Sequence, residues 1–197
     1  MSERKDMELI AELVPPGSRV LDLGCGNGEL LALLRARRQC TGYGIEISDA
    51  NVLSCTQRGV NVIQLNLEEG LALFEDQSFD VVLQLDTLQH LRNTEKMLFE
   101  TARVGRIGVV SFPNFAHWRC RVQLFLTGKA PVTKQLPFEW HNSPNIHCLS
   151  LKDFERFCRR LSVKVEKKIP LIKTRLSPVK FAPNLFAEQV IYVTSKD

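Results

Sequence analysis

The stretch that most constrains this chain is residues 20–28, which read Val-Leu-Asp-Leu-Gly-Cys-Gly-Asn-Gly. A short apolar run ends at three glycines on alternate positions, and leucines then recur at helical spacing over residues 30–34. This order predicts a strand, a tight loop and a helix. Glycines serve where a loop needs positive φ or where a ligand approaches the backbone, and the helix start offers free N–H groups. The stretch therefore predicts a seat for a nucleotide-like ligand.

The spacing of these glycines distinguishes between nucleotide ligands. A dinucleotide fingerprint, G-x-G-x-x-G, would require a third glycine where the chain has Glu29, and a phosphate loop would require Gly-Lys-Ser/Thr, which is missing. A pyrophosphate would also be repelled by Asp22 and Glu29. A cationic ligand suits the same two carboxylates, so the loop favours a ligand that carries positive charge.

Composition places the chain among ordinary globular proteins. Its 197 residues predict a single domain, residues 1–197, with a substantial core. The net charge of +4 is too small to indicate nucleic-acid binding by itself. No apolar run approaches the about 20 residues of a membrane span, and the charged N-terminus does not resemble a signal peptide. Six scattered cysteines without a C-x-x-C pair predict a reducing, cytoplasmic setting.

Strand and helix patterns alternate along the chain. Strands are expected at residues 19–23, 41–47, 60–65, 79–85 and 107–112, and helices at 6–14, 28–38, 48–58, 94–104 and 150–161, with a short helix at 71–74 and a loop or helical turn at 86–91. Strands that alternate with helices of this length predict an α/β fold with a parallel sheet. Two final strands are expected at 163–171 and 188–194, joined by a Pro-containing loop.

Residues 113–149 have a different character. Four prolines interrupt the pattern and aromatic residues are frequent, with one short helix expected at about 117–126. An insertion this long in a compact domain is usually functional, as a lid or a binding surface.

The D-x-G-x-G-x-G motif over 22–28 resembles the first motif of class I S-adenosylmethionine (SAM) methyltransferases. That resemblance implies a Rossmann-like fold, with a mostly parallel seven-stranded sheet, helices on both faces and a terminal antiparallel strand pair. It also implies SAM or S-adenosylhomocysteine as the cofactor. In such sheets ligands bind at the carboxyl ends of the strands. The residues expected to contact the cofactor are Asp22, Gly24, Cys25, Gly26, Gly28, Glu46, Ile47, Asn66, Leu67, Gln84 and Leu85.

Each strand end has a chemical role in this interpretation. Asp22 would orient the loop or meet the ammonium of the methionine moiety, and Glu46 could accept both ribose hydroxyls. Asn66 stands where the class I family often has Asp; its amide oxygen can accept from the adenine amino group, or it can form a turn. Leu67 could pack on the adenine. The family contacts the methionine part where this chain has Gln84 and Leu85.

Catalytic residues are less well defined by the sequence. Asp86 and His90 follow the fourth strand, where His90 could act as a base or be structural. The amino-methylating [N/D/S]-P-P-[Y/F/W] motif and the Pro-Cys nucleophile of cytosine-C5 enzymes are missing from the sequence. The histidines of the insertion do not have a standard zinc spacing, so no metal is expected.

Several segments resemble the methionine-biosynthesis MetW family, most specifically Gly-Val-Val-Ser-Phe-Pro-Asn-Phe-Ala-His-Trp over 108–118 and Leu-Pro-Phe-Glu-Trp-His-Asn-Ser-Pro-Asn-Ile-His over 136–147. Residues 19–28 and 86–90 also match. The resemblance implies a SAM-binding protein that acts with a homoserine O-acyltransferase as a partner or regulatory subunit. The alternative is an active methyltransferase on a small-molecule acceptor, with RNA as a less favoured acceptor. The sequence does not give the oligomeric state.

Overall fold

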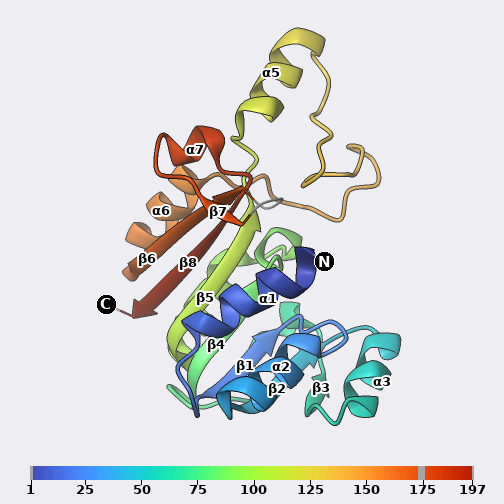
Figure 1. Cartoon of the computed structure of the whole chain (residues 1–197), viewed down its shortest axis with the longest axis vertical. Helices are drawn as coiled ribbons and strands as arrows, with labels where there is room; N and C mark the ends of the chain where they lie inside the picture. Colours follow the sequence, from blue (N-terminus) through green and yellow to red (C-terminus); the bar gives the residue numbers. More distant parts are fainter. Residues whose placement is uncertain (1, 173–175, 197) are drawn as a thin grey trace.

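The centre of the fold is a mixed β-sheet, shown in Figure 1. The computed structural model describes residues 2–172 and 176–196, and over these residues the sheet has eight strands in the order β3-β2-β1-β4-β5-β8-β6-β7. The strands are β1 (Arg19–Leu23), β2 (Thr41–Glu46), β3 (Val62–Gln64), β4 (Phe79–Leu85), β5 (Gly105–Pro113), β6 (Val163–Ile172), β7 (Ser177–Pro178) and β8 (Gln189–Lys196). Strands β1 to β5 pair in parallel, and β8, β6 and β7 add antiparallel neighbours at one edge.

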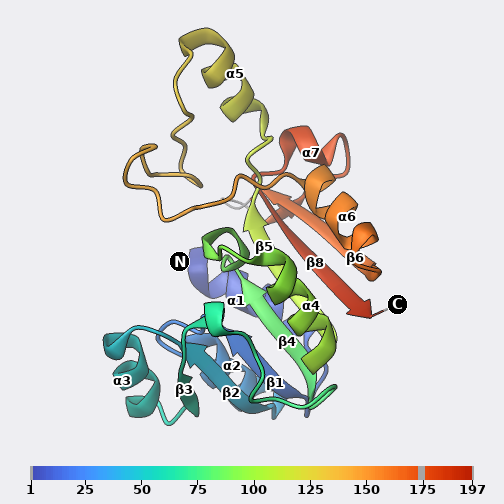
Figure 2. The same cartoon turned by 180° about the vertical axis from the view of Figure 1, so that it is seen from behind.

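Helices cover both faces of this sheet. Figure 1 shows α1 and α2 on one face, and Figure 2 shows α4 and α6 on the other. The α-helices are α1 (Ser2–Leu13), α2 (Glu29–Arg38), α3 (Asp49–Gln57), α4 (Thr94–Val104), α5 (Trp118–Thr127), α6 (Leu151–Arg160) and α7 (Pro183–Phe186), and the 3₁₀ turns are η1 (Leu67–Glu69) and η2 (Leu88–His90). No helix among the described residues is both long and apolar enough to cross a membrane.

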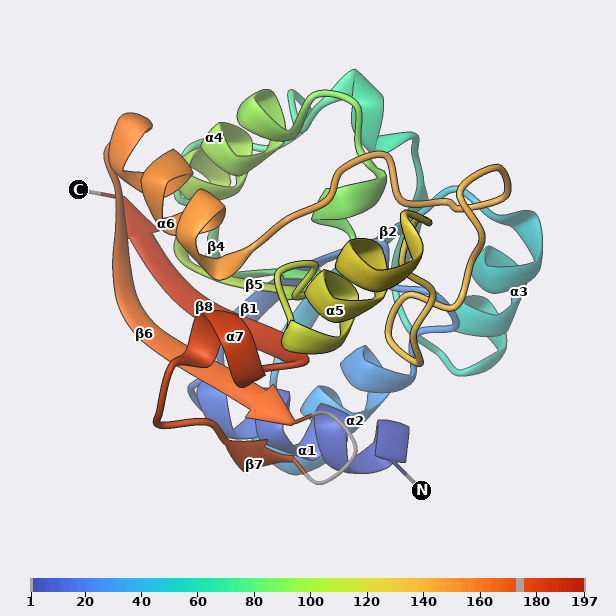
Figure 3. The same cartoon turned by 90° about the horizontal axis from the view of Figure 1, so that it is seen from above.

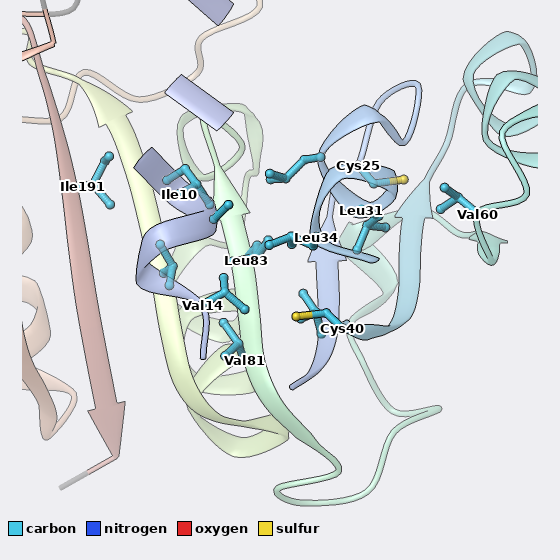
Figure 4. Close-up of a cluster of buried hydrophobic side chains, with 14 of the residues drawn as sticks. Ile10, Val14, Cys25, Leu31, Leu34, Cys40, Val60, Val81, Leu83 and Ile191 are labelled. Atoms are coloured by element: carbon cyan, nitrogen blue, oxygen red, sulfur yellow. The ribbon is translucent and has the colours of Figure 1, made fainter. Parts of the chain in front are cut away.

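The alternation of buried side chains along the strands explains the two covered faces. In β1, Val20 packs into the cluster beneath α1 and α2, which Figure 4 shows, whereas Leu21 packs into a second cluster with Met97 of α4. A third cluster joins α6 to the antiparallel edge through the rings of Phe112, Phe154 and Tyr192, whose centroids lie 4.6–5.9 Å apart. Both faces of the sheet are therefore apolar, as a parallel sheet between two helix layers requires.

The fold class predicted from the sequence is confirmed, including the antiparallel end of the sheet. The strand count is different: the sheet has eight described strands rather than seven, because β7 adds a two-residue edge to β6. So short an edge strand has no periodicity that a sequence pattern could reveal.

The short helix expected at residues 71–74 is wrong. The helical turn lies earlier, at η1, where the Asn66 side chain accepts a hydrogen bond from the Glu68 N–H at 3.0 Å. Gly70, at φ +92°, ends the turn, so the leucines that follow it lie in an irregular segment.

The insertion begins where β5 ends and lies over the carboxyl ends of the parallel strands. Figure 3 looks down on this end, with α5 in the foreground. Helix α5 was expected at 117–126 and spans Trp118–Thr127. The return segment rejoins the body at α6, whose first turn is capped by Ser150, since its hydroxyl accepts from the Asp153 N–H at 3.2 Å.

Candidate functional site

The glycine-rich loop follows β1, and the strand order reverses at β1, between β1 and β4. The loop also contacts the end of β2. The N–H groups of Gly24 and Cys25 both donate to the carbonyl of Ile45, at 2.8 and 3.0 Å. Gly24 has φ +79°, and a Cβ there would lie 3.0 Å from the Thr87 hydroxyl oxygen. Both the backbone conformation and the available space therefore favour glycine at this position.

Asp22 is the buried acid of the site. It is 4% exposed and lines a cavity of about 650 Å³. Burial, with a contribution from the nearby Glu46 carboxylate, raises the pKa of Asp22 to about 7. A cation placed in the cavity would favour the ionised form of Asp22, so the site is suited to a positively charged ligand.

Glu46 is held by the backbone around it. One carboxylate oxygen accepts from the Gly26 N–H at 2.9 Å, and the other accepts from the N–H groups of Ile47 and Ser48 at 3.0 and 2.9 Å. These three donors fix the side chain at the end of β2. A carboxylate offers about four acceptor positions, so Glu46 retains capacity for a further donor such as a hydroxyl.

The wall of the cavity is formed by several separate parts of the fold in addition to the glycine-rich loop. Of the sequence-predicted residues it brings together Asp22, Gly24, Cys25, Leu85 and Asp86. The remaining wall comes from α1, α2, the strand ends and the insertion, as Asp6, Met7, Leu9, Ile10, Asn27, Glu29, Leu30, Ser111, Lys134, Gln135, Pro137, Leu171, Gln189 and Ile191. A cavity of this size is in the usual range for small-molecule and cofactor sites.

Some predicted residues lie outside the wall of this cavity. Gln84 is fully buried, with its side-chain oxygen 3.5 Å from the Thr101 hydroxyl of α4. Leu67 belongs to the core cluster on the α4 face, and Asn66 is exposed. Gly26, Gly28, Glu46 and Ile47 belong to the loop and to the end of β2 that contacts it, beside the wall of the cavity. Their roles toward a cofactor remain predictions.

The two catalytic candidates have different surroundings. The His90 ring is exposed, and its Nδ1 lies 3.0 Å from the carbonyl of Pro144 in the insertion. Asp86 instead lines the cavity and takes φ +51°, a left-handed conformation that is uncommon outside glycine. The structure therefore ties His90 to the insertion and presents Asp86 to the cavity.

Two polar residues beside Asp86 were missed by sequence reasoning. The Gln189 side-chain amide lies 3.0 Å from both Asp86 carboxylate oxygens, and the Ser111 hydroxyl lies 3.4 Å from one of them. Both residues are more than 90% buried. Ser111 could have been found as the one hydroxyl in the apolar run of β5, whereas nothing in the sequence marks Gln189, because only the antiparallel β8 brings it here.

The potential metal ligands of the chain are dispersed in the part that the structure describes. Over residues 2–172 and 176–196, no three His, Cys, Asp or Glu side chains are placed to hold a metal ion. His117 of the insertion has a structural contact, since its Nδ1 accepts from the Arg119 N–H at 3.3 Å at the start of α5. Burial lowers the pKa of this imidazole.

Comparison with models of known protein families shows to which family this chain belongs. The family model described as methionine biosynthesis protein MetW matches residues 4–194. This chain belongs to the MetW family. The bifunctional methionine biosynthesis protein MetXA/MetW of Rhodopirellula baltica is 38% identical over 173 residues, which are 83% of this chain and 28% of that protein. A ubiquinone biosynthesis O-methyltransferase of Hahella chejuensis is 34% identical over 64% of this chain and 55% of its own length. The chain thus spans about a quarter to about half of these two relatives.

Solved structures place this MetW family member in a known fold. A SAM-dependent methyltransferase from Mesorhizobium loti superposes with a TM-score of 0.72 at 14% identity, covering 98% of this chain and 97% of that one. One from Archaeoglobus fulgidus gives a TM-score of 0.69 at 16% identity, over 99% and 92%. The chain therefore has the Rossmann-like methyltransferase fold.

Proposed function

We propose that this chain binds SAM in the cavity above the glycine loop and works in methionine biosynthesis together with a homoserine O-acyltransferase. The observation that carries SAM binding is Asp22, a buried carboxyl with a pKa of about 7 in the wall of a cofactor-sized cavity. SAM carries a sulfonium and an ammonium, and either would stabilise the ionised carboxylate. The solved structures from Mesorhizobium loti and Archaeoglobus fulgidus are named as SAM-dependent methyltransferases, which supports the same ligand.

The chain's own residues fit the other parts of SAM. Gly24 allows the backbone to approach the ligand without a Cβ in the way. Glu46, fixed by three backbone N–H groups, would accept the ribose hydroxyls with its remaining lone pairs. When bound, SAM supplies an activated methyl group; the protein's contribution is to orient the ligand and to exclude water.

Support for the partnership comes from the fused relative. The Rhodopirellula baltica protein carries the names MetXA and MetW on one chain, which supports joint action of the two parts. Because SAM is a product of the methionine branch, a SAM-binding subunit could report product level to an early enzyme of that branch. Such regulation requires SAM to bind the free and the complexed subunit with different affinities.

Calorimetry with purified protein tests the SAM site. Glu46→Ala should weaken SAM binding by about 1–3 kcal/mol, because a charged acceptor for two hydroxyls is lost. Glu166→Ala is the matched control and should leave the affinity unchanged, because the Glu166 carboxylate accepts from the Ser195 hydroxyl at the antiparallel edge of the sheet. Equal affinity of wild type and Glu46→Ala would reject the ribose role.

The partnership has its own test. Purified homoserine O-acyltransferase from the same organism is mixed with the chain, and complex formation is followed by size-exclusion chromatography with and without SAM. A shared elution peak whose amount changes with SAM supports the proposal. Two independent peaks under both conditions would contradict it.

A second candidate function is methyl transfer to a small acceptor, and the position of Asp86 is the observation that favours it. Its carboxylate lies in the cavity wall beside Ser111 and Gln189, where it can accept a hydrogen bond from an N–H or O–H of an acceptor. This function predicts S-adenosylhomocysteine formation with such an acceptor and a loss of turnover in Asp86→Asn. Turnover that is unaffected by Asp86→Asn would remove the residue from this role.

A further inference from the structure

Helix α5 exposes an unusual amount of apolar surface. Phe125 and Leu126 are 87% and 71% exposed, and Trp118 and Val122 are 40% and 44% exposed. The four positions follow the spacing i, i+4, i+7 and i+8, so they share one face of the helix. Figures 1 and 2 show α5 extending beyond the end of the sheet, away from the helices that cover its faces. A continuous apolar stripe on the surface of a folded domain marks an interaction site.

The charged residues of the segment that carries this stripe are all of one sign. Residues 114–138 contain no Asp or Glu, whereas Arg119, Arg121, Lys129 and Lys134 are all cationic. Arg119 also stacks over the Trp118 ring, with its guanidinium carbon 5.5 Å from the ring centroid. Two copies of this face would repel each other. The surface that complements it is an apolar groove with an acidic rim.

We infer that α5 docks as a helix into an apolar, acidic-rimmed groove of the homoserine O-acyltransferase; this inference rests on the proposed function. Apolar anchors at i, i+4 and i+7 are how an amphipathic helix is recognised in a groove. The basic residues beside the stripe steer the encounter and set the orientation. Phe125 is the central anchor, because it is the most exposed large aromatic side chain on the helix.

The segment that follows α5 connects this docking face to the cofactor cavity. The Gln123 side-chain oxygen of α5 accepts from the Val132 N–H at 3.2 Å, and residues 133–136 then form a turn closed by two hydrogen bonds. This turn and the residue after it place Lys134, Gln135 and Pro137 in the cavity wall. The segment that lines the cavity is therefore the segment that holds α5, and we expect SAM and the acyltransferase to affect each other's affinity through it.

Affinity measurements with the purified homoserine O-acyltransferase test the inference. Phe125→Ala should weaken the complex by about tenfold or more, as expected for an aromatic hot spot. Phe181→Ala is the matched control, because Phe181 is 79% exposed but lies between β7 and α7, outside the insertion.

Arg121→Gln should lower the affinity for the acyltransferase less than Phe125→Ala does, and it should reduce the dependence of that affinity on salt. Gln123→Ala should leave complex formation intact and reduce the effect of SAM on it.

The outcomes separate this inference from the function on which it rests. If wild type binds the acyltransferase and Phe125→Ala binds equally well, the docking inference is overturned and the partnership stands. If wild type does not bind the acyltransferase, both are overturned, whereas SAM binding by calorimetry is judged separately. Two further results would overturn docking to the acyltransferase: a homodimer that Phe125→Ala dissociates, or binding to phosphatidylserine vesicles that depends on Phe125.

Discussion

The aromatic cluster between α6 and the antiparallel edge of the sheet differs from helix α5 in how its aromatic side chains are placed. In the body, Phe112 is fully buried, with its ring 5.1 Å from that of Phe154 and 5.9 Å from that of Tyr192. In the insertion, Phe125 of α5 is 87% exposed. Phe112, Phe154 and Tyr192 therefore contribute to folding, and Phe125 remains available for binding. The difference indicates that the two regions can be changed independently.

The largest effect is expected in the body. Phe112→Ala should lower the free energy of unfolding by about 3–5 kcal/mol, because it empties a fully buried aromatic site. Urea denaturation followed by circular dichroism measures this change. A loss below about 1 kcal/mol would mean that the cluster of Phe112, Phe154 and Tyr192 is not part of the core.

The second prediction concerns Asp22, whose burial in the cofactor site lowers the free energy of unfolding at neutral and higher pH. Because its folded pKa of about 7 lies above the value of 3.8 for an exposed Asp, its contribution to stability is fully present below pH 3.8 and is lost as the pH rises through 7. Asp22→Asn should therefore stabilise the ligand-free protein at pH 8 by about 1–4 kcal/mol, because a pKa difference of one between the folded and unfolded chain corresponds to about 1.4 kcal/mol.

The same variant should bind SAM less well. In wild type, SAM affinity should rise between about pH 6 and pH 8, because a cation needs ionised Asp22, and Asp22→Asn should flatten this dependence. Thermal unfolding and calorimetry over that pH range measure both effects. A variant that is less stable than wild type at pH 8, with the same pH dependence of SAM binding, would contradict this role of Asp22.

Gly24→Ala tests the loop itself. The left-handed φ of +79° and the Thr87 side chain at 3.0 Å should together cost about 1–3 kcal/mol of stability. SAM affinity should fall as well, because Gly24 lines the cavity. Gly17→Ala is the matched control: its φ is +73°, but a Cβ there would meet no atom within 4 Å. Gly17→Ala introduces the backbone strain without a steric clash and outside the cavity wall. An equal fall in SAM affinity in both variants would mean that general backbone strain, and not the position of Gly24 in the wall, lowers the affinity.

Features that depend on local sequence patterns could be predicted from the sequence, whereas contacts between distant segments could not. The glycine loop and the alternation of strands and helices are local patterns, and they were enough to predict the fold class and the acid Asp22 that lines the cavity. Contacts that depend on the path of the whole chain were out of reach. Gln189 meets Asp86 because β8 returns antiparallel beside β5, and α1 contributes Met7 to the cavity only through its packing on the sheet. The 3₁₀ turn at η1 replaced an expected helix for a local reason, since Asn66 caps its own turn.

The smallest effect on stability is expected where the effect on binding is largest. Phe125→Ala should change the free energy of unfolding by less than about 0.5 kcal/mol, because the side chain is already in water in the folded protein and loses few contacts. Denaturation in urea at matched conditions compares it directly with Phe112→Ala. A destabilisation near that of Phe112→Ala would show that α5 packs against the body in solution, and α5 would then be a lid over the cavity rather than a docking helix. A neutral result combined with a weakened acyltransferase complex would separate folding from recognition within one chain.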